Sequence, residues 1–364
     1  MKVPYVDLKA QYLDHKKEIL DSINSVMESG QYIMGPELKT FEDNFAKLSD
    51  TTHAIGVDNG TSALSLSMRV LGIGEGDEVI TAPNSFFSSA SSIIHTGAQP
   101  VFCDVKEDQN IDPQEIEKHI TKKTKAIMPV HLTGKIADMN PILELAREKG
   151  IHVIEDAAQS AGALYHGKKS GSMGITGCFS LHPLKNLNGA GDGGIITTQD
   201  DSIAKKLRLI RNHGMIDRET IPSWGYNSRL DCLQASILNV KIKFLEEVNI
   251  KRRKNASLYR NLLKNIVQCP NDEDNCFDIY HLFVIQTDHR DQLQKFLKKF
   301  DIETSIHYPT PIHLFECCKR LGHKEGDFPK VEAQSKRILS LPIHQHLTQE
   351  QIEYTANKII QFFS

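Results

Sequence analysis

The stretch EVITAPNSFFSSASSIIHTGAQPVFCD, residues 78–104, carries the pattern that decides the fold. A short run rich in β-branched residues (78–82) is followed by a helical pattern (86–95) and by a second strand-like run (99–104). Strands that alternate with helices of this length form a mainly parallel sheet with helices on both faces. We therefore expect an α/β fold.

The same alternation continues outward from this stretch. Further strands are predicted at 124–129, 152–155, 178–181 and 194–198, and further helices at 62–70, 112–121, 140–149 and 202–212. Ligands of such sheets bind at the carboxyl ends of the strands, so polar residues that follow a strand are the first functional candidates.

The pattern changes after about residue 230. A long helix is predicted from 231 to about 263, with a break near 247–249. Beyond it we predict strands at 281–287 and 302–307 and helices at 290–299 and 349–363. We therefore expect a large domain over residues 1–245 and a small C-terminal α+β domain over residues 246–364.

Composition excludes several classes of protein. The 364 residues are 40% hydrophobic and carry a net charge of −3, which argues against a basic nucleic-acid binder and against a disordered chain. No run reaches the roughly 18 apolar residues of a membrane span, and the start lacks a signal-peptide core. Seven scattered cysteines favour a reduced, cytoplasmic compartment. We expect no metal site, even at His344-Gln345-His346, because no third ligand is evident.

Four motifs hold the candidate functional residues. NGTSAL (59–64) opens a helix, where free backbone N–H groups attract an anion. A predicted strand ends at a carboxylate in HVIEDAAQS (152–160). Lys185 precedes a glycine-rich turn in CFSLHPLKNLNGAGDGG (178–194). APNSFFSSAS (82–91) offers two aromatic rings. Each motif alone has a plainer interpretation: a helix cap, a solvated carboxylate, a surface lysine and a core phenylalanine.

Together the motifs suit pyridoxal 5′-phosphate. A lysine forms a Schiff base with its aldehyde, a carboxylate keeps its pyridine nitrogen protonated, and a helix N-terminus holds its phosphate. A nucleotide-binding protein is the alternative. It is disfavoured because the chain has neither GxGxxG nor a Walker motif.

At these motifs the chain resembles the DegT/StrS family of pyridoxal-phosphate sugar aminotransferases. The resemblance runs from VPYVDLKAQY (3–12) through SGQYIMGPELKTFE (29–42), IEDAAQSAGA (154–163), FSLHPLKNL (179–187) and GYNSRLDCLQASI (225–237) to GDFPKVEAQSKRILSLPIHQHLT (326–348). It implies the aspartate-aminotransferase type of fold and a homodimer with shared active sites.

The resemblance also implies roles for individual residues. Lys185 matches the Schiff-base lysine and Asp156 the partner of the pyridine nitrogen. Gln159 matches the contact to the ring's phenolic oxygen, and Phe86 the aromatic that stacks on the ring. The implied phosphate contacts are Gly60, Thr61, Ser62, Ser180 and, from the other subunit, Asn227.

By the same resemblance, L-glutamate would donate an amino group to a keto group of a nucleotide-linked sugar, for surface glycan synthesis. SIHYPTPIHL (305–314) resembles members that act on the third carbon of the sugar, so we favour a 3-keto sugar. A 4-keto or an acidic keto sugar is the alternative. Candidate substrate contacts are Lys135, His307, Tyr308 and His313.

Two other functions stay open. Some relatives are dehydratases with histidine in place of the Schiff-base lysine, and Lys185 at this position favours transamination over a dehydratase or lyase. A non-catalytic regulator on the same fold would have little reason to keep Lys185, Asp156 and Gln159 together.

Overall fold

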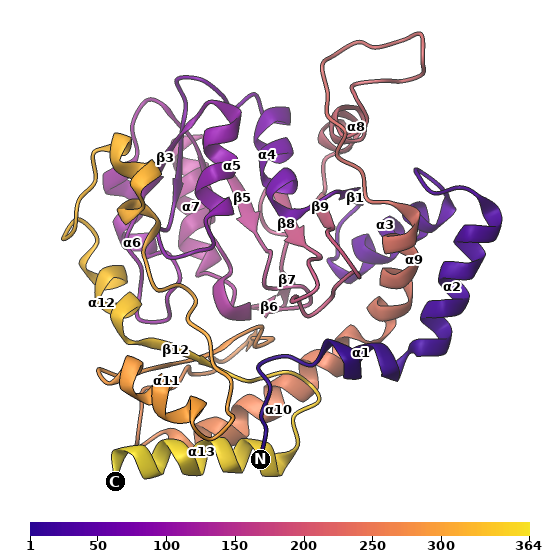
Figure 1. Cartoon of the computed structure of the whole chain (residues 1–364). Helices are drawn as coiled ribbons and strands as arrows, with labels where there is room; N and C mark the ends of the chain where they lie inside the picture. Colours follow the sequence, from indigo (N-terminus) through magenta and orange to yellow (C-terminus); the bar gives the residue numbers. More distant parts are fainter.

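The computed structural model describes all residues, 1–364, and has a seven-stranded sheet at its centre (Figure 1). Its strands are, in spatial order, β1 (His53–Val57), β9 (Gly194–Thr198), β8 (Thr176–Ser180), β5 (His152–Asp156), β4 (Thr124–Ile127), β2 (Glu78–Thr81) and β3 (Gln99–Phe102). The five strands from β8 to β3 are parallel, whereas β9 pairs antiparallel with both β8 and β1. The predicted α/β fold with a mainly parallel sheet is confirmed.

Helices cover both faces of this sheet because its strands are apolar on both sides. In β5, Val153 packs into one hydrophobic cluster and Ile154 into another on the opposite face. The covering helices are α3 (Pro36–Leu48), α4 (Gly60–Val70), α5 (Ser88–Thr96), α6 (Pro113–Ile116), α7 (Met139–Lys149), α8 (Asp201–Ile210) and α9 (Cys232–Lys241). Two helices, α1 (Leu8–Asp14) and α2 (Lys16–Ser29), precede them.

A second core lies in the C-terminal part of the chain. Strands β11 (Phe283–Gln286) and β12 (Ile338–Leu341) pair antiparallel, and α10 (Leu245–Leu263), α11 (Arg290–Lys298) and α13 (Gln349–Phe363) pack beside them (Figure 1). Val3 is buried in this core, where it bridges Ile302. The N-terminus therefore packs against the C-terminal part, and the division of the chain near residue 245 stays a prediction.

Smaller elements complete the chain. They are β6 (Leu164–Tyr165), β7 (Lys168–Lys169), β10 (Cys276–Phe277), α12 (Pro329–Arg337) and 3-10 turns at 117–119, 132–134, 242–244, 312–314 and 316–321. No helix combines the length and the apolar composition that crossing a membrane requires.

Three local predictions differ from the structure. The long helix breaks at the 3-10 turn Ile242–Phe244, before the expected position near 247–249. The segment 302–307 makes only isolated bridges, through Ile302 and Ser305, and is not a strand. The true partner of β11 is β12, whose short apolar run follows a helix without a break.

A buried ion pair fixes the edge of the sheet. Arg211 and Glu42 pair with less than a tenth of either side chain exposed. Glu42 also accepts the Gly56 N–H at 2.8 Å, and Arg211 donates to the Gly56 carbonyl at 2.8 Å. The pair thereby joins α3, β1 and the end of α8.

We predict that Glu42→Ala lowers the free energy of unfolding by about 3–5 kcal/mol, because the Arg211 charge stays buried without its partner. Urea unfolding measures this change. The matched control is Asp43→Ala, which removes a more exposed carboxylate paired with Lys39 on the same helix and should cost under about 1 kcal/mol. Equal losses in the two variants would contradict the role of the buried pair.

Candidate active site

The predicted motifs meet at one edge of the sheet, at the carboxyl ends of β1, β2, β5 and β8. A cavity of about 370 Å³ opens there and extends to residues of the C-terminal part. Nine of the predicted site residues line it: Gly60, Thr61, Phe86, Asp156, Gln159, Ser180, Lys185, His307 and Tyr308. Segments that are far apart in the sequence thus form one site.

Asp156 is the last residue of β5 and is buried. Its Oδ2 accepts the Ser89 hydroxyl at 2.7 Å, and its Oδ1 accepts the Ala158 N–H at 3.3 Å. Burial raises the pKa of this carboxyl, and the two hydrogen bonds and the nearby Lys185 oppose the rise. A cationic group placed in the cavity would favour the charged form of the Asp156 carboxyl.

Lys185 lies five residues beyond the end of β8, in a turn that is held by hydrogen bonds to its own backbone. Its N–H donates to the His182 carbonyl at 2.9 Å, and its carbonyl accepts from Asn188 at 3.0 Å. Burial lowers the pKa of the amine to about 8, against the attraction of Asp156. A lysine with a lowered pKa is a better nucleophile near neutral pH.

The turn from β1 into α4 is suited to hold a phosphate. The Asn59 side chain caps the Ser62 N–H at 2.9 Å, which leaves the N–H groups of Gly60 and Thr61 without helical partners. A Cβ at Gly60 would lie 2.9 Å from the Ser180 Cβ, so glycine allows the turn to approach the end of β8. These N–H groups and the helix dipole favour an anion.

Gln159 and Phe86, the two remaining predicted ring contacts, come from two separate segments. Gln159 is buried and accepts the Thr133 N–H at 2.8 Å through its Oε1. Phe86 is 57% exposed, and its ring lies 5.9 Å from that of Tyr308. A large aromatic ring left this exposed beside a cavity is available to cover a flat ligand.

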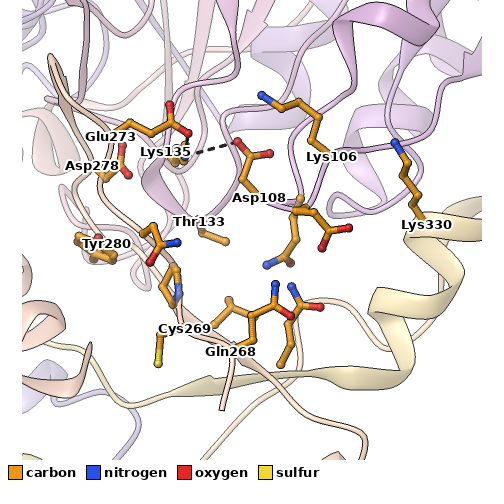
Figure 2. A pocket seen from close by; sticks show the side chains of 16 residues that line it. Lys106, Asp108, Thr133, Lys135, Gln268, Cys269, Glu273, Asp278, Tyr280 and Lys330 are labelled. Atoms are coloured by element: carbon orange, nitrogen blue, oxygen red, sulfur yellow. Dashed lines mark hydrogen bonds and ion pairs between the residues drawn. The ribbon is translucent and has the colours of Figure 1, made fainter. Parts of the chain in front are cut away.

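Two substrate candidates lie elsewhere. Lys135 lines a separate polar cavity of about 440 Å³, where it pairs with Asp108 at 3.5 Å and Glu273 at 2.6 Å (Figure 2). His313 is buried and holds Glu332 at 3.0 Å. Both side chains already have carboxylate partners away from the first cavity, so we give neither a part in substrate binding.

Two phosphate candidates also lie outside the cavity. Ser62 does not line the cavity, and its N–H donates to the Asn59 side chain. Asn227 belongs to the segment between α8 and α9, which projects from the body of the molecule (Figure 1). Its exposed position is compatible with a contact made to another copy of the chain.

Sequence reasoning missed the buried support behind Asp156. Glu155 is fully buried and accepts four hydrogen bonds, from the His131 ring at 2.9 Å and from the N–H groups of Gly171, Met173 and Gly174. The His131 N–H in turn donates to the Asp156 carbonyl. Glu155 precedes Asp156 on the strand, so its side chain points to the opposite face of the sheet. This alternation is the only sign in the sequence that Glu155 supports Asp156 from behind.

Comparison with known proteins identifies the class to which this fold and site belong. The model of the DegT/DnrJ/EryC1/StrS aminotransferase family matches residues 13–360. The chain is a member of that family, as the motifs predicted, and the family's activity as transaminases confirms the predicted class of enzyme.

Three relatives cover nearly the whole chain. A pleiotropic regulatory protein of Geobacillus stearothermophilus is 43% identical over 100% of this chain and 99% of its own. A dTDP-3-amino-3,4,6-trideoxy-α-D-glucose transaminase of Streptomyces venezuelae is 40% identical, over 96% and 93%. A UDP-2-acetamido-2-deoxy-3-oxo-D-glucuronate aminotransferase of Pseudomonas aeruginosa is 38% identical, over 95% and 96%.

Solved structures share the fold. DesV of S. venezuelae, in complex with a ketimine intermediate, superimposes with a TM-score of 0.98 at 39% identity, over 100% of this chain and 99% of its own. NtdA of Bacillus subtilis, with bound cofactor PMP, gives a TM-score of 0.92 at 29% identity, over 100% and 85%. The fold is thus that of family members with known ligands.

The lowered pKa of Lys185 predicts a pH dependence of stability. Between about pH 8 and 10.5, the ordinary value, the native amine has lost its proton while the unfolded chain still holds it. The unfolded state then binds more protons, so stability rises with pH in this window. The free energy of unfolding of cofactor-free wild type should therefore rise relative to Lys185→Met from pH 8 to 10.5. Denaturant unfolding at several pH values measures it, and a constant difference would show that the pKa is not lowered.

Proposed function

We propose that the protein is a pyridoxal-phosphate-dependent aminotransferase that moves an amino group from L-glutamate to a keto group of a nucleotide-linked sugar. The observation that carries the proposal is the cavity shared by Lys185, Asp156 and the free N-terminus of α4. Amine, carboxylate and anion cradle are the three groups that this cofactor needs.

The residues fit the cofactor on physical grounds. The N–H groups of Gly60 and Thr61, with Ser180, would hold its phosphate, and Asp156 would hold its pyridine nitrogen. Phe86 would cover one face of its ring, and Gln159 would contact its phenolic oxygen. When bound, the cofactor supplies an electron sink for the bond that loses a proton.

The chain's own groups then have separate tasks. Lys185 would hold the cofactor and, once freed by the amino donor, would move a proton as a general acid and base, for which its lowered pKa is suited. Asp156 would stay charged opposite the protonated pyridine nitrogen of the cofactor. The Ser89 hydrogen bond fixes the direction of the Asp156 carboxylate.

For the sugar we favour a 3-keto substrate. His307 and Tyr308 line the cavity, as expected from the motif that carries them. Burial lowers the pKa of His307 to about 4, so its ring is a neutral hydrogen-bonding group suited to hydroxyls. The names of two relatives, a 3-amino sugar transaminase and a 3-oxo sugar aminotransferase, point to the same carbon. A 4-keto or an acidic keto sugar is the second candidate, and surface glycan synthesis the expected pathway.

A regulatory function is the competing hypothesis, because a relative at 43% identity is named a regulatory protein. A protein that only regulates would not need a lysine with a lowered pKa beside a buried carboxylate. Amino transfer is therefore the function that the site supports best.

The test is a two-step reaction with purified protein loaded with the cofactor. L-Glutamate alone should change the visible absorbance of the bound cofactor and release 2-oxoglutarate. Addition of 3-keto and 4-keto nucleotide sugars in parallel should then restore the absorbance with the true substrate. Consumption of sugar without an amino donor would support the dehydratase alternative, and no reaction with any donor would support the regulator.

We predict that Asp156→Asn binds the cofactor but lowers kcat by at least about 100-fold, because the pyridine nitrogen loses its charged partner. Steady-state kinetics and the absorbance of bound cofactor measure the two effects separately. Asp201→Asn, whose carboxylate is exposed, is the control and should behave as wild type. Near-normal turnover of Asp156→Asn would refute the role given to this residue.

We also propose a homodimer in which Asn227 completes the phosphate site of the partner subunit. The segment 215–226 exposes several large apolar side chains: Ile216 at 69%, Ile221 at 57%, Trp224 at 97% and Tyr226 at 41%. Exposed apolar groups gathered on one projecting segment are typical of an interface. A second copy is the occupant that the shared site requires.

We predict that Trp224→Arg shifts the protein from dimer to monomer and weakens cofactor binding at least tenfold, because each site loses the partner's Asn227. Light scattering after gel filtration and cofactor titration measure the two effects. Lys243→Arg, in the 3-10 turn after α9, is a control that should leave both unchanged. A Trp224→Arg dimer with full cofactor affinity would contradict the proposal.

A further inference from the structure

Arg252 of α10 is a buried cation without an anionic partner. Only 4% of the residue is exposed. Its Nη1 donates to the carbonyls of Tyr280 at 3.1 Å and His281 at 3.2 Å, while its Nε is buried with no acceptor. The single ionisable group that favours its charge is the phenol of Tyr5. Two weak backbone contacts leave most of this charge uncompensated.

The surroundings of Arg252 belong to the active-site cavity. Arg252 and Lys185 are the only lysine or arginine side chains in its lining. His281, His307 and His344 lie on the same side, and burial lowers the pKa of each, so they are neutral at physiological pH. Arg252 is thus the one permanent positive charge in this part of the cavity.

A second donor on this wall is also unpaired. Tyr5 lines the cavity, and its hydroxyl is buried without a hydrogen-bond partner. Its ring is held in place by stacking on His307, with 5.9 Å between the ring centroids. Each buried donor without an acceptor calls for an explanation, and a ligand in this cavity would supply an acceptor to both Arg252 and Tyr5.

We propose that Arg252 and Tyr5 form the site that binds a carboxylate of the amino-acid donor. A guanidinium and a neighbouring hydroxyl match the geometry and charge of a carboxylate. Every amino-acid donor carries this group, whereas a keto sugar need not carry an anion at that position. The phosphate of the cofactor is provided for separately, at the start of α4. The inference rests on the proposed function, since it names the group by which the donor is held.

The binding test uses glutarate, a dicarboxylate that has no amine and cannot react. Calorimetric titration of cofactor-loaded protein should give an affinity at least tenfold weaker in Arg252→Lys, because lysine lacks the planar pair of donors. Tyr5→Phe should weaken binding by roughly tenfold through loss of one hydrogen bond to a charged group. Arg253→Lys is the matched control, because the neighbouring Arg253 lines neither cavity and instead holds the Asp278 carbonyl.

Donor analogues then identify the carboxylate. L-Glutamine lacks the distal carboxylate and L-isoglutamine lacks the α-carboxylate. Wild type should bind one of the two analogues much more weakly than it binds L-glutamate. This difference in affinity should be smaller in Tyr5→Phe and in Arg252→Lys. The kcat/KM for the nucleotide sugar should not change in either variant. If Arg252 only supported the fold, its substitution would impair the reactions of the amino donor and of the nucleotide sugar together.

The outcomes separate this inference from the proposed function. Glutarate binding that depends on Arg252 and Tyr5 supports the inference even if no sugar is aminated. Glutarate affinity within twofold of wild type in Tyr5→Phe and in every Arg252 variant that folds overturns it, even if the enzyme is an active aminotransferase. Tyr5→Phe keeps the ring and its packing, so it tests the site even if Arg252→Lys fails to fold.

Discussion

The amine of Lys185 and the carboxylate of Asp156 share one cavity, and burial drives both toward their neutral forms. The rest of the site depends on this constraint, because burial makes the charged form of each group costly unless an opposite charge or a hydrogen-bond donor lies beside it. The two residues meet because β5 and β8 are adjacent parallel strands, with Asp156 opposite Cys178 in register. Their carboxyl ends therefore open into the same space.

A rigid layer behind the cavity supports this arrangement. Glu155 ties the segment 171–174 to His131, and His131 holds the backbone of Asp156. Thr133, two residues after His131, fixes Gln159. Asp156 and Gln159 are thus held by hydrogen-bonded neighbours behind the cavity, which is how proteins hold a reactive geometry without the help of solvent.

Much of this could be predicted from the sequence, because the decisive signals are local. Alternating apolar runs predicted the positions of β2, β5, β8 and β9, and glycines marked the turn that follows β8. The sequence did not reveal β12, because its pairing with β11 is non-local. It also did not reveal Arg252, which lies in a helix rich in basic residues and differs from Arg253 only in the face that it presents. His313 was assigned to the substrate from a motif and Lys135 from its charge, but each side chain pairs with a carboxylate away from the active-site cavity.

The most direct test of the account is to find where the cofactor is attached. The protein is saturated with pyridoxal 5′-phosphate, reduced with borohydride to make any Schiff base permanent, and digested for mass spectrometry. The account predicts one modified peptide that carries the cofactor on Lys185, and none in Lys185→Ala. A cofactor fixed on another lysine, or no fixed cofactor in wild type, would contradict it.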